Sequence, residues 1–107
     1  MDLHRLAEER SLAYHRRVAS LLPQRPDLFV QAKQRAQAWA ASGQRHAPYA
    51  QKWLSLIEGS FENLVSALTD ASEQGRALRQ ATPFSGALDP RERWRLWREV
   101  REAMEAQ

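Results

Sequence analysis

The chain contains no cysteine, and only four glycines and 8% aromatic residues are found among its 107 residues. Without thiols it can form no disulfide, no thiolate zinc site and no cysteine nucleophile. The glycines are scattered, so there is no glycine-rich loop to cradle a phosphate. No stretch approaches the roughly eighteen apolar residues of a membrane-spanning helix, and the N-terminal residues lack the apolar run of a secretory signal. These absences predict a cytoplasmic protein with no cofactor and no membrane contact.

The charge is mixed rather than one-sided. The formal net charge is +3, from 16 basic and 13 acidic side chains, and all the basic residues except Lys33 and Lys52 are arginines. The two signs alternate along the whole chain, and no segment is a strong cationic block. Because general affinity for nucleic acid needs a clustered basic patch, composition alone gives little support to that function.

Apolar residues recur at helical spacing, and the period-two alternation of a strand is absent. At 43% hydrophobic and 27% charged residues, the composition is that of a globular domain. We therefore predict an all-α single domain over residues 1–107, a compact bundle of about six helices with irregular or orthogonal packing. The expected helices cover residues 2–22, 26–42, 48–59, 61–68, 71–81 and 90–104.

Three helix starts carry recognisable capping residues. Asp89 followed by Pro90 is the clearest, because a first-turn proline loses no hydrogen bond there. Ser60 is the expected N-cap of the helix over 61–68. Asp70, with Glu73 three residues later, resembles a capping box and predicts a start near residue 71.

The larger apolar residues indicate where the core lies. Trp39, Trp53 and Trp97 each fall on an apolar face of their helix, so we expect all three to be largely buried. Phe84 and Leu88 are the large apolar residues of the connection before the last helix. They are expected to hold that connection against the core.

No catalytic or metal-binding constellation is recognisable. His4, Glu8 and His15 share one stripe of the first helix, but eleven residues separate the two histidines by about 16 Å, too far for one ion. We expect these three to face solvent, and we predict neither an enzyme nor a metal protein. A helix-turn-helix over 67–86 is disfavoured because Pro83 would interrupt its recognition helix.

The first helix carries two arginines near the centre of its apolar arc. An unpaired buried guanidinium is costly, so three explanations are open. The arginines can reach the surface along their stems, pair with carboxylates inside the fold, or belong to a contact surface. The first two together are favoured, but among the candidate sites of this chain the contact surface ranks first, because apolar stripes with arginine are typical of interfaces. The predicted partner-binding face comprises Leu6, Arg10, Tyr14, Arg17 and Leu21.

Arginines and tryptophans alternate in the last helix, and two interpretations compete. The residues Arg91, Trp94, Arg95 and Arg98 could contact nucleic acid, because tryptophan stacks on bases and arginine contacts phosphates. The favoured interpretation is a solvated face in which the charges form i,i+4 ion pairs and arginines cover the rings.

The C-terminal third resembles small helical proteins of bacteria with GC-rich genomes, some of which are similar to antitoxin-like members of toxin–antitoxin pairs. The residues that carry the resemblance are Ala77-Leu78-Arg79-Gln80, Thr82-Pro83-Phe84-Ser85-Gly86 and the segment from Leu88 to Arg95. The resemblance implies a partner-binding protein. We therefore expect a non-catalytic regulatory or accessory factor that binds a protein partner or a second copy of itself, with nucleic acid binding as the alternative.

Overall fold

The computed structural model describes residues 2–44 and 47–107, and within them the secondary structure is entirely helical. The predicted all-α fold is confirmed, and the expected helix bounds agree with the observed ones to within about two residues. No helix in the described part of the chain is long and apolar enough to cross a membrane. The elements are α1 (Leu3–Leu21), the short 3₁₀ helix η1 (Leu22–Gln24), α2 (Pro26–Ser42), α3 (Ala47–Glu58), α4 (Phe61–Leu68), α5 (Glu73–Gln80) and α6 (Pro90–Glu105).

Local side-chain caps explain where the helices begin. The Asp89 side chain accepts a hydrogen bond from the Glu92 amide at 2.9 Å, and Ser60 caps α4 in the same way. The expected cap of α5 is wrong, since Ser72 is the N-cap and the Asp70 carboxylate accepts instead from the Ser72 amide at 2.8 Å. Asp70 therefore shapes the turn before the helix, and α5 begins two residues later than predicted.

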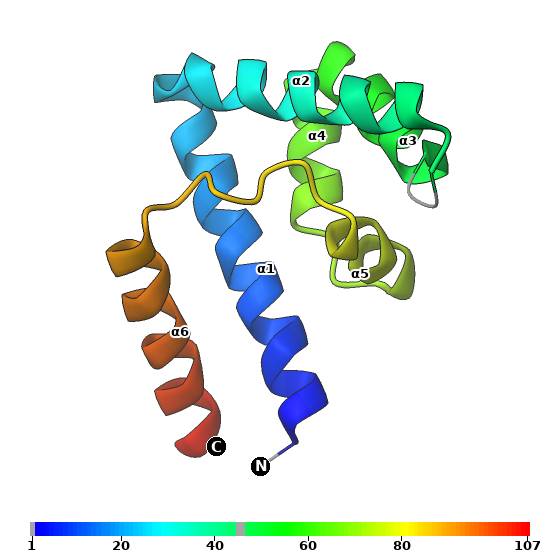
Figure 1. The fold of residues 1–107 in the computed structure, drawn as a ribbon. Helices are drawn as coiled ribbons and strands as arrows, with labels where there is room; N and C mark the ends of the chain where they lie inside the picture. The colour runs from blue at the N-terminus through cyan, green and yellow to red at the C-terminus, as the bar shows by residue number, and fades with distance from the viewer. Residues whose placement is uncertain (1, 45–46) are drawn as a thin grey trace.

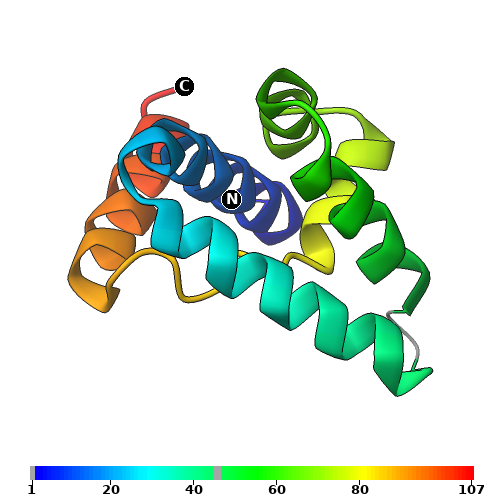
Figure 2. The same ribbon diagram turned by 90° about the horizontal axis from the view of Figure 1, so that it is seen from above.

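Helix α1 is the central element of the fold. Helix α2 lies across its C-terminal end and packs along α3, while α4 and α5 lie against α1 on one side (Figures 1 and 2). Helix α6 returns along the other side of α1 in the opposite direction, which brings the two ends of the chain together. There the guanidinium of Arg5 donates to the Gln107 side chain at 3.1 Å.

The core brings together residues from five of the helices and from the connection between α5 and α6. Trp53 has no exposed surface and meets the Phe84 ring edge-on, with centroids 5.9 Å apart. Trp39 and Trp97 are only half-buried, so the expectation of three buried tryptophans holds for Trp53 alone. The buried cluster comprises Tyr14, Val18, Ala19, Leu22, Leu28, Ala32, Ala36, Trp53, Leu64, Leu68, Leu78, Phe84 and Leu88.

The connection over residues 81–89 is held firmly in place. Phe84 and Leu88 are 2% and 3% exposed, which confirms that they attach it to the core. The Tyr14 hydroxyl donates to the Phe84 carbonyl at 2.7 Å and accepts from the Ala87 amide at 3.1 Å. Arg35 donates to the Pro83 carbonyl from the opposite side at 3.1 Å. The connection thus crosses α1 as a fixed strap.

Helix α6 lies on the outside of the fold. It contains no buried residue, and its principal packing partner is α1. Leu96 and Trp97 contact the edge of the core but stay half-buried. The apolar face read from the sequence of this helix is therefore real, but it covers α1 without entering the core.

Candidate functional site

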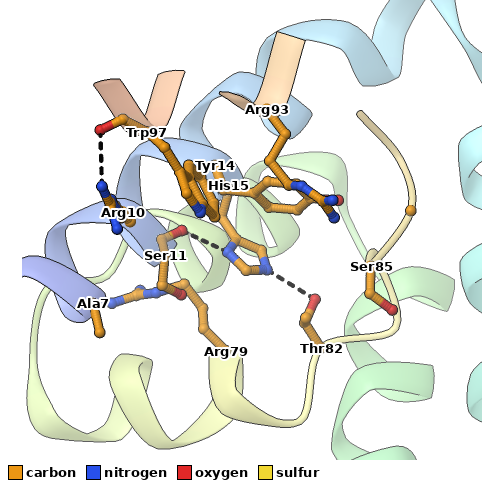
Figure 3. Close-up of a pocket in the computed structure, with 11 residues that line it drawn as sticks. Ala7, Arg10, Ser11, Tyr14, His15, Arg79, Thr82, Ser85, Arg93 and Trp97 are labelled. Carbon is orange, nitrogen blue, oxygen red and sulfur yellow. Dashed lines mark hydrogen bonds between the residues drawn. The ribbon is translucent and has the colours of Figure 1, made fainter. Parts of the chain in front are cut away.

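A pocket of about 370 Å³ lies where α1, α5, the strap over residues 81–89 and α6 meet. Small-molecule sites typically enclose about 300–1,000 Å³, so its size suits a small organic ligand. The side chains around it come from all four elements (Figure 3). The lining residues are Ala7, Arg10, Ser11, Tyr14, His15, Arg79, Thr82, Ser85, Gly86, Arg93 and Trp97.

Arg79 is the most unusual residue of the pocket. Its side chain is on α5 and the residue is only 3% exposed. One guanidinium nitrogen donates to the Asp70 carbonyl, while Nε is buried with no hydrogen-bond partner among the described residues. Burial lowers the pKa of Arg79, yet an arginine keeps its proton at neutral pH. A charged group is therefore held inside the fold without a carboxylate in contact with it.

Gly75 makes this placement of Arg79 possible. A Cβ atom at position 75 would overlap the carbonyl oxygen of Asp70, the same atom that accepts from Arg79. The turn before α5 can therefore close over the helix only because residue 75 lacks a side chain. The close approach fixes the acceptor that orients the guanidinium.

Two further arginines line the pocket from other helices. Arg10, on α1, donates to the Trp97 carbonyl at 3.4 Å, and its guanidinium carbon lies 5.9 Å from the centroid of the Trp97 ring. The Nε atom of Arg10 is buried and also lacks a partner in the described structure. Arg93, on α6, is exposed, and its side chain forms no ion pair with another described residue. The described lining of the pocket contains no acidic side chain.

His15 is a neutral hydrogen-bonding residue at the back of the pocket. Nδ1 lies 2.7 Å from the Ser11 carbonyl and must donate to it, so Nε2 accepts from the Thr82 hydroxyl at 2.8 Å. Burial lowers the pKa of His15 to about 4, and the nearby Arg79 charge acts in the same direction. With its pKa near 4, the ring is a weak base at neutral pH, although Nε2 accepts from the Thr82 hydroxyl.

The pocket is consequently rich in hydrogen-bond donors and positive charge. The unsatisfied donors are guanidinium groups, and the hydroxyl of Tyr14 and the ring of His15 are engaged within the fold. Carboxylates and phosphates are the natural partners of such groups, because charge-assisted bonds to guanidinium are strong and directional. The arrangement can bind an anion through its guanidinium groups.

The predicted partner-binding face on α1 is not an open surface in this structure. Leu6 and Tyr14 are buried, and Leu21 packs against the core. Arg17 is exposed but pairs with Glu92 of α6 at 2.5 Å. Of the three explanations for the α1 arginines, internal pairing applies to Arg17, and Arg10 belongs to the pocket.

The predicted nucleic-acid residues lie together on the outer side of α6. Arg91, Arg95 and Arg98 are exposed, and Trp94 is 61% exposed. The Arg98 guanidinium carbon lies 4.7 Å from the Trp94 ring centroid and Arg98 also approaches Glu102 at 3.9 Å, as the favoured solvated-face interpretation expects. Pro90, Arg91, Trp94 and Arg95 line a surface hollow of about 550 Å³.

Sequence reasoning missed the central residues of the pocket. No pattern in the sequence marks Arg79 or Arg93 as a site residue. The prediction that His15 faces solvent is wrong, because His15 is only 2% exposed. His4, on the same stripe, is exposed as expected. The missing signal is tertiary, because the hydroxyl that fixes His15 lies 67 residues further along the chain.

Neither a search for metal ligands nor a comparison with known proteins helps to assign a function. No group of three metal-ligating side chains gathers among residues 2–44 and 47–107. A comparison with protein families, with curated proteins and with solved structures finds no match to this chain. The resemblance to antitoxin-like proteins therefore stays a hypothesis.

Proposed function

We propose that this chain is a non-catalytic regulatory or accessory protein that binds a small organic anion in the arginine-lined pocket. The observation that carries the proposal is Arg79, a guanidinium that is 3% exposed and has a buried Nε without a partner in the described structure. Keeping a charge buried and unpaired lowers stability. An anion bound in the pocket would supply a partner for the positive charge of Arg79.

The rest of the pocket supports an anion over a cation or a neutral ligand. Arg10 and Arg93 add positive charge from two other helices, and the described lining has no carboxylate to neutralise them. The pKa of His15 is lowered to about 4, far from neutral pH, so the ring is poorly suited to general-base catalysis. Binding without chemistry is the function that fits these groups.

Regulation through a protein partner, or through a second copy of the chain, is compatible with this ligand. With the α1 face covered by α6, the exposed side chains of α6 are the better contact for such a partner. Trp94 is exposed there among arginines, a combination enriched at interface hot spots. An antitoxin-like role belongs to this part of the proposal.

A nucleic acid is the second candidate for the outer side of α6. Arg91 and Arg95 form no ion pair with a described residue, and both flank the exposed Trp94 ring. A single strand could stack a base on Trp94 and place phosphates beside the arginines. Binding of a fluorescent single-stranded oligonucleotide that weakens steeply with salt and is lost in Trp94→Ala would support it; unchanged binding in that variant would exclude this site.

Replacing the buried charge tests the proposed pocket. In Arg79→Gln the amide can still donate to the Asp70 carbonyl, while the unpaired charge is removed. We expect the free energy of unfolding to change by less than about 1 kcal/mol, because the lost hydrogen bonding is offset by the removed burial penalty. Binding of small carboxylates, measured by calorimetry, should weaken by at least about tenfold, the loss of a charge-assisted bond.

Arg76→Gln is the matched control. Arg76 is in the same helix, is partly exposed and pairs with Glu8 at 3.2 Å outside this pocket. It should keep the affinity of the unmodified chain. If Arg79→Gln unfolds the protein while no small anion binds the unmodified chain, Arg79 is a structural residue and the proposal is wrong.

A further inference from the structure

The pocket lies between α6 and the rest of the fold. Arg93 and Trp97 belong to α6, whereas the other lining residues belong to α1, α5 and the strap. Helix α6 has no buried residue and packs principally on α1. A ligand that fills the pocket therefore touches α6 on one side and the body of the fold on the other (Figure 3).

The chemistry of the walls differs from one side of the pocket to the other. The side chains of Arg10 and Arg79 both line the pocket, and their guanidinium groups carry the positive charge that an acidic group needs. Trp97 offers an aromatic wall, and its ring meets Tyr14 edge-on with centroids 6.0 Å apart. Ala7 and Gly86 add apolar or side-chain-free surface. Charge and aromatic surface thus occur together within one ligand-sized space.

The size of the space argues against a very small anion. A water molecule takes up about 30 Å³ in the liquid, so a phosphate or an acetate would leave most of the 370 Å³ to water. Aromatic groups bury a large apolar area and favour edge-on or offset contacts with neighbouring rings. An acidic group carried on a flat ring would use the donors and the indole wall at once.

On the basis of the proposed anion-binding function, we infer that the ligand is an aromatic carboxylate that bridges α6 to α1 and α5. Its carboxylate lies between Arg10 and Arg79, and its ring lies against Trp97. Because such a ligand loses most of its contacts when α6 moves away, its binding holds α6 on α1. The ligand thereby controls access to the α1 residues that α6 covers.

The ligand class is tested on the unmodified full-length chain by calorimetry with three probes. They are 1-naphthoate, acetate and the neutral 1-naphthalenemethanol. We expect 1-naphthoate to bind at least about tenfold more tightly than either of the others, since each lacks one of the two groups that the pocket recognises. Inorganic phosphate serves as a fourth probe and should bind no better than acetate.

The bridging role is tested by amide hydrogen exchange with and without 1-naphthoate. At a concentration of about 100 times its Kd, a ligand that binds only the docked state slows exchange through undocking by about 100-fold. We expect this slowing for amides in α6. Amides that exchange by local opening in α2 and α3, which contribute no lining residue, serve as the control and should not change.

The outcomes separate the two proposals. If acetate and phosphate bind as tightly as 1-naphthoate and all three depend on Arg79, the anion pocket stands and the aromatic class is wrong. If 1-naphthoate binds but exchange in α6 is unchanged, the ligand does not bridge the two parts. If none of the four probes binds the unmodified chain, the anion pocket itself is refuted.

Discussion

Burial keeps the ring of His15 neutral, and the nearby Arg79 charge acts in the same direction against the opposing hydrogen bond to the Ser11 carbonyl. Its pKa is lowered from 6.5 to about 4, so the unfolded chain binds a proton between these pH values and the folded chain does not. Stability should therefore decrease as the pH falls through this window, by up to about 3 kcal/mol. Chemical denaturation at pH 7 and at pH 4.5 measures the loss.

A non-titrating side chain at this position identifies the source. In His15→Gln the decrease between pH 7 and pH 4.5 should shrink by most of that amount, although the variant is less stable at pH 7. His4→Gln changes an exposed histidine and should leave the decrease intact. An equal pH dependence in all three proteins would show that His15 is not responsible.

The same residue shows what one-dimensional patterns miss. The stripe of His4, Glu8 and His15 predicts a polar, solvent-facing side of the helix. The prediction is correct for His4 and wrong for His15. Burial of His15 is decided by Thr82, which the strap brings over the ring at a distance of 2.8 Å. No local property of the first helix encodes that neighbour.

At the scale of elements, short-range signals located the helices well. Asp89-Pro90 and Ser60 act on amides two or three residues away, so their effect is visible in the sequence. Asp70 was misassigned because two capping residues, Asp70 and Ser72, lie so close together. The half-burial of α6 could not be predicted, because helical periodicity shows which face packs and not how deeply.

The strap over residues 81–89 depends on one aromatic anchor. Phe84 is 2% exposed and contacts Trp53, so Phe84→Ala leaves a cavity next to the largest core residue. We expect the free energy of unfolding to fall by about 3–5 kcal/mol, the usual cost for a buried aromatic. Thermal and urea denaturation give the value.

Phe61→Ala provides the comparison for the strap. Phe61 is 43% exposed, so the same truncation should cost clearly less there. A loss below about 1 kcal/mol for Phe84→Ala would mean that the strap is not anchored through this ring.

At the scale of the whole molecule, the fold class followed from the sequence but the pocket did not. The helices are local objects, whereas the pocket assembles Arg10, Arg79 and Arg93 from three elements. The hydrogen bond from Arg10 to Trp97 joins residues 87 positions apart. A single sequence contains no signal for such a pairing, so the site became visible only with the tertiary structure.

The pairing of the first and last helices also has a consequence for the order of folding events. Joining Gln107 to the N-terminus through a short glycine-rich linker, and opening the chain between the exposed Gly59 and Ser60, gives a circular permutant. In it α6 and α1 are adjacent in sequence and form a helical hairpin. The contacts between α1 and α6 become local in sequence, so we expect faster refolding in stopped-flow tryptophan fluorescence if they form in the rate-limiting step. An unchanged rate would place the docking of α6 after the rate-limiting step, which would make this helix the last part of the molecule to assemble.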